Sequence, residues 1–166
     1  MWKYIAKHFQ GYPTRKKIAQ KMLKYGLKTK KNKIYCGNIQ LSDSKIAKAL
    51  NIDRRAVKST TEHIQKKPEL KKIFENLRPT SNLKEIAPEM KWGIIEIIPD
   101  DPSQPGILAE IAKIIAENHI SIRQAISDDF EITEQPKLFV VTDKTIPSEI
   151  IPKIKKAKGV KAVLIY

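Results

Sequence analysis

Apolar residues recur at helical spacing through most of the first 77 positions of the chain. Three polar side chains or pairs suited to N-capping stand just before such stretches: Thr14, Ser42 or Asp43, and Asp53. The pattern predicts helices over residues 1–9, 14–25, 43–50, 53–67 and 68–77.

A short hairpin separates the second and third of these helices. Residues 34–36 and 39–41 flank Gly37-Asn38, which is a two-residue turn signal between short strands. The Lys-rich residues 28–33 before the hairpin are expected to form a basic loop. Residues 1–78 are therefore predicted to be a mostly helical domain with one short β-hairpin.

The pattern changes after residue 91. Strand, helix, strand, strand, helix and strand are predicted in turn, over residues 92–98, 107–118, 120–127, 137–142, 148–156 and 160–166. Right-handed crossovers convert this βαββαβ order into a four-stranded antiparallel sheet with both helices on one face, a ferredoxin-like unit. The chain is thus expected to be an α+β protein, with residues 79–91 as a linker between two domains.

The positive charge lies in one half of the sequence. The whole chain has a formal net charge of +14, but residues 1–78 hold 21 Lys and Arg against 5 Asp and Glu, a net +16, and residues 79–166 hold 11 against 13, a net −2. A basic composition bias of the whole chain would affect both halves. The asymmetry instead indicates a polyanion-binding first domain.

Several classes of function find no support in the sequence. Cys36 is the single cysteine, so no internal disulfide can form. The most apolar run, residues 94–98, is too short to cross a membrane, and no signal-peptide core precedes it, so a soluble cytoplasmic protein is expected. The histidines are scattered, and the carboxylates of residues 128–134 are more typical of a solvated turn than of a cation site. No phosphate loop or nucleophile elbow is present either, so we expect no catalytic residue, no metal, no cofactor and no enzyme activity.

Residues 43–67 resemble the helix-turn-helix family. Ala47 is a small residue where the two helices would cross, and Ile52 would fill the turn between them. The sequence departs from the family at Asn51, where glycine is frequent, but asparagine also tolerates the left-handed conformation. The resemblance implies double-stranded DNA as the partner, read by the second helix in the major groove.

Outward-facing polar residues of these two helices are the candidate DNA contacts. The arginines are suited to guanine, and the residues at the start of the first helix to the phosphate backbone. The candidates are Ser42, Ser44, Lys45, Arg54, Arg55, Lys58, Ser59, Thr61 and Glu62. The alternative is a basic helical hairpin that only packs against the rest of its domain.

The second half resembles the ACT family of small-molecule sensors. The likeness rests on Asp101, the Pro105-Gly106-Ile107-Leu108 run, Asn118 and residues 120–122, although Ser103 and Gln104 are placed inside the loop. It implies that copies pair edge to edge and bind an amino acid between a loop of one copy and the sheet of another. The candidate effector residues are Asp100, Asp101, Gly106, Ile107, Leu108, Asn118 and Gln124. A tight turn in a dimerisation module without a ligand is the alternative.

The whole chain resembles archaeal proteins described as predicted regulators of amino-acid metabolism. In the first half, residues 34–39, 46–50 and 53–55 carry that match. The resemblance implies a DNA-binding transcription regulator, allosterically controlled by an amino acid, that forms a homodimer or tetramer through its ACT domains. Two alternatives stay open: a non-specific nucleic-acid or RNA-binding protein, and an ACT-type regulatory subunit of a biosynthetic enzyme.

Overall fold

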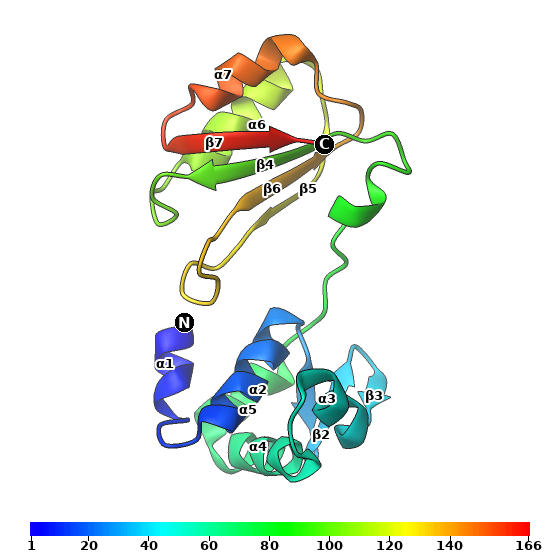
Figure 1. The fold of residues 1–166 in the computed structure, drawn as a ribbon, viewed down its shortest axis with the longest axis vertical. Coiled ribbons are helices and arrows are strands. Elements are labelled where there is room, and N and C mark those ends of the chain that lie inside the picture. The colour runs from blue at the N-terminus through cyan, green and yellow to red at the C-terminus, as the bar shows by residue number, and fades with distance from the viewer. The chain divides into compact units, whose positions relative to one another are not determined.

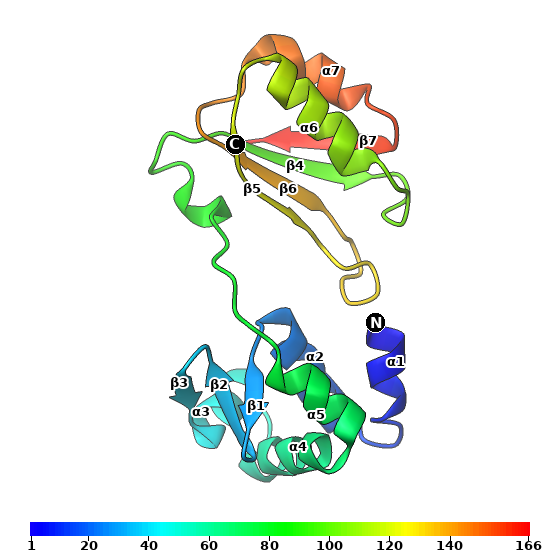
Figure 2. The same cartoon turned by 180° about the vertical axis from the view of Figure 1, so that it is seen from behind.

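A computed structural model describes all residues from 1 to 166. The chain forms two compact units, residues 1–81 and residues 82–166 (Figures 1 and 2). Each unit has its own hydrophobic core and is described separately.

Unit 1 contains five helices and a three-stranded antiparallel sheet of order β1-β2-β3. Its elements are α1 (Trp2–Lys7), α2 (Pro13–Lys24), β1 (Lys28–Lys30), β2 (Lys33–Cys36), β3 (Ile39–Leu41), α3 (Asp43–Leu50), α4 (Arg54–Lys66) and α5 (Pro68–Glu75). Helix α4 is central, because it contacts α2, α3, α5 and β2. Val57 and Ile64 of α4 are fully buried, as are Leu70 and Phe74 of α5.

Local capping explains where the two helices of the turn begin and end. Ser42 Oγ accepts a hydrogen bond from Lys45 N at the start of α3, and Asp53 accepts one from Arg55 N at the start of α4. Asn51 has the left-handed conformation at the end of α3, with φ 52°. These caps are confirmed, but the predicted cap of α2 is wrong. Tyr12 occupies its N-cap without a side-chain bond, because Pro13 begins the helix one residue before Thr14.

The predicted hairpin is confirmed, but the predicted basic loop is wrong. Residues 28–30 form strand β1, which pairs with β2 through a turn at Lys31 and Asn32, both with positive φ. Strands β2 and β3 then pair around Gly37-Asn38. Side chains of a strand alternate between the two faces of the sheet, and only Thr29 of β1 enters the core. The other two residues of β1 are lysines, so the sequence shows no apolar alternation that would predict a strand.

Unit 2 has the predicted βαββαβ order, and its fold class is confirmed. Its elements are the 3₁₀ turn η1 (Lys84–Ile86), β4 (Ile94–Pro99), α6 (Ile107–Glu117), β5 (Ile122–Ser127), β6 (Leu138–Thr142), the 3₁₀ turn η2 (Ser148–Ile150), α7 (Ile151–Lys155) and β7 (Val160–Ile165). The antiparallel sheet has the order β5-β6-β4-β7. Both helices cover one face of this sheet (Figure 1). Isoleucines dominate the core between them, including Ile95, Ile97, Ile111 and Ile115.

The other face of this sheet is covered in part by the segment that leads into β4. Ala87 is fully buried against Ile94 and Val141, and Leu83 and Trp92 pack around them. Residues 83–92 therefore belong to unit 2 as a packed segment.

A buried carboxylate lies on this second face. Glu96 in the central strand β4 is 2% exposed and receives hydrogen bonds from Lys84 Nζ, at 3.1 Å, and from Lys137 Nζ. Burial alone would raise the pKa of Glu96, but the two lysines outweigh it and hold the pKa below the ordinary value. Lys84 also lies 4.4 Å from the centre of the Phe139 ring. The Glu96–Lys84 pair thus attaches the covering segment to the sheet.

We expect Glu96→Gln to lower the free energy of unfolding by about 1–3 kcal/mol, because two partly buried ammonium groups lose their counter-charge. The pKa of Glu96 is depressed, so this stabilisation is present above pH 4.5 and is lost as the pH falls through the folded-state value. Urea unfolding at pH 7 and pH 3 measures both effects. The control is Glu110→Gln on the exposed side of α6. Equal unfolding midpoints for the two variants at pH 7 would contradict the prediction.

We also expect acid to destabilise unit 1 through His63. Its Nε2 lies 2.8 Å from His8 O, and its ring packs beside those of Phe9 and Tyr12. Burial lowers the pKa of His63 below 6.5, so the unfolded chain binds the proton more readily and stability falls as the pH drops below that value. In His63→Gln the fall in urea midpoint between pH 7.5 and pH 5.5 should be smaller than in the wild type. The control is His119→Asn, a change at an exposed histidine, which should show the same decrease in urea midpoint as the wild type. A decrease of wild-type size in His63→Gln would show that His63 is not responsible.

Candidate nucleic-acid and effector sites

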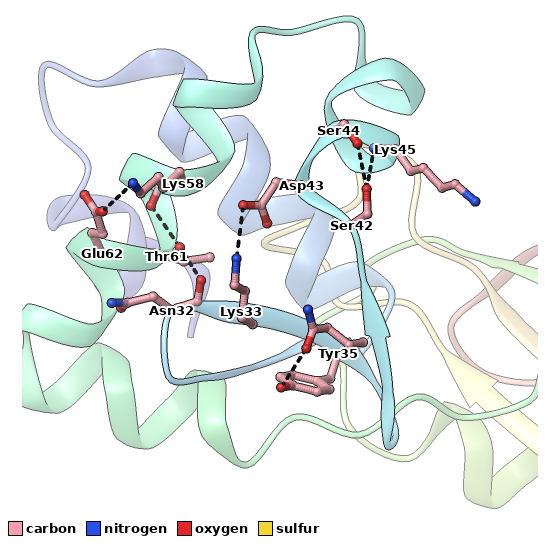
Figure 3. A network of polar contacts seen from close by, with 11 residues as sticks. Asn32, Lys33, Tyr35, Ser42, Asp43, Ser44, Lys45, Lys58, Thr61 and Glu62 are labelled. Carbon is pink, nitrogen blue, oxygen red and sulfur yellow. Dashed lines mark hydrogen bonds and ion pairs between the residues drawn. The ribbon is translucent and has the colours of Figure 1, made fainter.

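The N-termini of α3 and α4 open onto one polar cleft of about 490 Å³. Its polar lining comes from strands β2 and β3, from the start of α3 and from the first two turns of α4. These residues are Lys33, Gln40, Ser42, Asp43, Ser44, Arg54, Arg55 and Lys58. Figure 3 shows five of these residues, Lys33, Ser42, Asp43, Ser44 and Lys58. The positive ends of the two helix dipoles favour anions at such a place, in addition to the lysine and arginine charges, whereas the Asp43 carboxylate opposes them.

Arg55 is held by its own helix cap. Its guanidinium lies 3.3 Å (Nε) and 3.2 Å (Nη2) from the Asp53 carboxylate, and its side chain is 91% exposed. The Arg55 side-chain hydrogen bond lowers the pKa of Asp53, so the carboxylate stays ionised over the neutral range. Arg55 is thus oriented at the start of α4 while its outer edge stays accessible.

The next turn of α4 is partly engaged within the helix. Lys58 Nζ lies 4.0 Å from Glu62 Oε1, and Ser59 Oγ donates to Ala56 O at 3.1 Å. Lys58 remains exposed, whereas Ser59 and Glu62 are half-buried. Of these three candidates, only Lys58 lines the cleft.

The expectation that Thr61 faces outward is wrong. Thr61 is fully buried, and its Oγ1 lies 2.8 Å from Lys58 O and 3.2 Å from Asn32 O. The prediction rested on helical spacing alone, because Thr61 stands three residues after the exposed Lys58 on the same helix. The β1–β2 turn packs on this side of α4 and removes Thr61 from solvent (Figure 3).

The cleft also differs from the predicted site at the start of α3. Lys45 does not line it; its side chain extends away from Asp43 and Lys33 (Figure 3) and lies along a neighbouring apolar groove. Lys33 and Gln40 do line it, although sequence reasoning did not select them. Strand alternation could have identified them, because Lys33 and Gln40 stand next to Ile34 and Leu41, which face inward, and must therefore face the opposite side of the sheet.

A second, smaller cavity of about 150 Å³ lies in unit 2 at the start of α6. Gly106, Ile107 and Leu108 form one wall, and the ends of β5 and β6 form another, with Ser127, Asp128 and Lys137. Gly106 has φ 96°, and a Cβ built there meets no atom within 4 Å. The backbone at the helix N-terminus is therefore open to a small ligand.

The other four candidate effector residues do not line this cavity. Asp100 is exposed, and Asp101 accepts hydrogen bonds from Ser103 N and Oγ, at 2.8 and 2.7 Å, which lower its pKa and shape the loop. Asn118 caps the far end of α6, about 18 Å away along the helix axis. Gln124 accepts from Leu83 N at 2.9 Å and holds the covering segment.

The carboxylate that lines this cavity is that of Asp128, a residue that is not among the candidate effector residues. Its Oδ2 accepts from Lys137 N at 3.2 Å, which fixes the side chain at the ends of β5 and β6. Sequence reasoning grouped Asp128 with the acidic turn that follows. The pairing of β5 with β6 brings it opposite the α6 N-terminus, and no local pattern encodes that pairing.

Comparison with known families identifies the class of unit 2. Residues 102–159 match the family model described as ACT domain, so the chain contains an ACT domain. The match begins in the loop before α6 and ends just before β7; it covers about a third of the chain. No curated protein matches the sequence.

Solved structures give only weak overall similarity. A homoserine dehydrogenase from Thiobacillus denitrificans is 16% identical over 68% of this chain, with a TM-score of 0.35, and the chain spans only 28% of that protein. AsnC from E. coli is 13% identical over 75% of this chain and 77% of its own, with a TM-score of 0.29. A transcriptional regulatory protein of the AsnC family from Pyrococcus furiosus is 14% identical over 76% and 77%, with a TM-score of 0.27. Likeness at this level does not bear on function.

No helix has both the length and the apolar composition needed to cross a membrane. No group of three or more His, Cys, Asp or Glu side chains is arranged to hold a metal ion.

Proposed function

We propose that the protein is a DNA-binding transcription regulator of amino-acid metabolism, controlled by an amino acid that binds its ACT domain. The observation that carries the proposal is the cleft at the N-termini of α3 and α4, which is lined by Arg54, Arg55 and Lys58 of α4. That cleft belongs to a unit with a net charge of +16, and the same chain contains an ACT domain.

The polar face of α4 fits the major groove of double-stranded DNA. Val57 and Ile64 are buried on the opposite side, so the exposed Arg54, Arg55 and Lys58 project from the first turns, where recognition helices contact base edges. The exposed Ser42 and Ser44 at the start of α3 would contact the phosphate backbone. A homodimer or tetramer formed through ACT domains would present two such helices about 34 Å apart to a pseudo-palindrome.

The cavity at the start of α6 suits the two charged groups of an amino acid. Amides of Ile107 and Leu108 at the helix N-terminus favour a carboxylate, and Asp128 can accept an ammonium group. A cavity of about 150 Å³ within one chain is small, so a partner copy would complete the site. The effector changes DNA affinity only as far as it binds the two arrangements of the subunits differently.

Selection of bound sequences from a random duplex pool tests the proposal directly. We expect a palindromic motif at about 150 mM salt whose enrichment changes with one amino acid in the mixture. Binding without any motif, which fades as salt rises, would support the non-specific nucleic-acid-binding alternative. Co-purification with a biosynthetic enzyme and no DNA binding would support the regulatory-subunit alternative.

Two variants separate base reading from backbone contact. Arg55→Ala should relax the preference at one position of the motif, at a cost of about 1–3 kcal/mol on the preferred sequence. Lys45→Ala should weaken all sequences alike, because this exposed cation lies on α3 outside the cleft, where it would contact phosphates and no base edge. Anisotropy titrations against the motif and its single-base variants measure both, with Lys113→Ala in α6 as a control for lost charge. If Arg55→Ala has the same effect on every duplex, Arg55 does not read a base.

Gly106→Ala tests the effector site. The added methyl group would occupy the open space in front of the α6 N-terminus, so we expect loss of the thermal shift caused by the effector. Gly11→Ala is the matched control, because Gly11 also has a positive φ, 77°, and open space around it, but lies in unit 1. Both variants should lose about 1 kcal/mol of stability through backbone strain. An unchanged effector shift in Gly106→Ala would exclude this cavity.

A further inference from the structure

The outer face of the three-stranded sheet in unit 1 is a basic surface that the proposed α3–α4 site does not include. Strand alternation sends Thr29 and Ile34 into the core, where both are fully buried. The opposite side of the sheet therefore presents only polar or basic residues and one aromatic: Lys28, Lys30, Lys33, Tyr35 and Gln40. We call these five residues the basic sheet face.

The register places like charges together on this face. Lys30 pairs directly with Lys33 across β1 and β2, and Lys28 pairs with Tyr35. Directly opposed like charges destabilise an antiparallel pair, and the face itself contains no carboxylate. The carboxylate nearest to Lys33 is that of Asp43, 3.9 Å from its ammonium group. Such an arrangement favours a polyanion as the missing counter-charge.

The basic sheet face has a depression, and hydrogen bonds hold some of its side chains in place. A depression of about 440 Å³ is lined by Lys28, Lys30, Lys31, Tyr35 and Asn38. Lys28 Nζ donates to Asn38 Oδ1 at 3.4 Å, and Tyr35 OH donates to Gln40 Oε1 at 3.2 Å. Ammonium groups and a phenol along one groove match the phosphodiester and sugar groups of a nucleic-acid strand.

The basic sheet face continues into the α3–α4 cleft. Lys33 and Gln40 belong to both, since they also line the cleft with Arg54 and Lys58. The β1–β2 turn is tied to α4 because Thr61 Oγ1 lies 3.2 Å from Asn32 O (Figure 3). The sheet therefore keeps a fixed position beside the helix that we assign to the major groove.

We propose that the basic sheet face binds the phosphate backbone of the same DNA duplex, next to the groove entered by α4. This inference rests on the proposed function. It adds a second contact surface, which positions the protein on the duplex without reading its sequence. The sheet would act like the wing of a winged-helix domain, a β-hairpin that contacts DNA beside the recognition helix, but here it precedes that helix in the chain.

The test is the salt dependence of binding to a fluorescent duplex of about 40 base pairs that carries the selected motif. In Lys28→Gln/Lys30→Gln the slope of log K against log salt should become less steep by about two, since each lost phosphate contact removes about 0.9. Affinity at 0.1 M salt should fall about tenfold or more, and the selected motif should not change. Lys28→Arg/Lys30→Arg, which keeps both charges, should retain the wild-type slope.

The matched control is Lys71→Gln/Lys72→Gln on α5, which removes the same charge from exposed positions of the same unit. If this control and the sheet variant change the slope equally, the effect is one of net charge and the inference is overturned. If the sheet variant behaves as the wild type, it is also overturned, while the proposed function survives because the wild type still binds its motif. If the wild-type protein does not bind duplex DNA, both proposals fail.

Discussion

The burial of one side of α4 is the constraint on which unit 1 depends. Helices α2, α3 and α5 and strand β2 all contact α4, and Val57, Thr60, Thr61 and Ile64 are fully buried there. Because this side of the helix is fixed in the core, the remaining side must face solvent, and it carries Arg54, Arg55 and Lys58. The same packing holds the β1–β2 turn against α4, so the basic cleft and the basic sheet face form one continuous surface.

In unit 2 the main constraint is that a four-stranded sheet has two faces to bury, whereas both helices lie on one of them (Figure 1). The second face is covered in part by residues 83–92, through apolar contacts at Ala87 and an ion pair between Lys84 and Glu96. An ionised carboxylate in a central strand is tolerated because two lysines compensate its desolvation. The segment that enters the ACT domain is therefore a part of its structure.

Most of the fold could be predicted from periodicity and from local capping. Helical spacing and the Ser42 and Asp53 side chains located α3 and α4, and the βαββαβ order of unit 2 followed from alternating patterns and crossover handedness. The predictions were wrong where two local patterns favour different structures. Strand β1 is rich in lysine and was therefore predicted to be a loop, and Pro13 begins α2 one residue before the predicted cap at Thr14.

The sequence by itself determined the chemistry available to this protein: the charge of the first unit, the helices that carry it, and the Pro105-Gly106 turn of the ACT domain. The tertiary structure alone decided which residues meet. It buried Thr61, directed Lys45 away from the α3–α4 cleft, brought Lys33 and Gln40 into that cleft, and placed Asp128 in the wall of the cavity at the α6 N-terminus. The physical reason is that these placements depend on strand pairing and helix packing between residues distant in sequence, whereas caps, turns and periodicity act within a few residues.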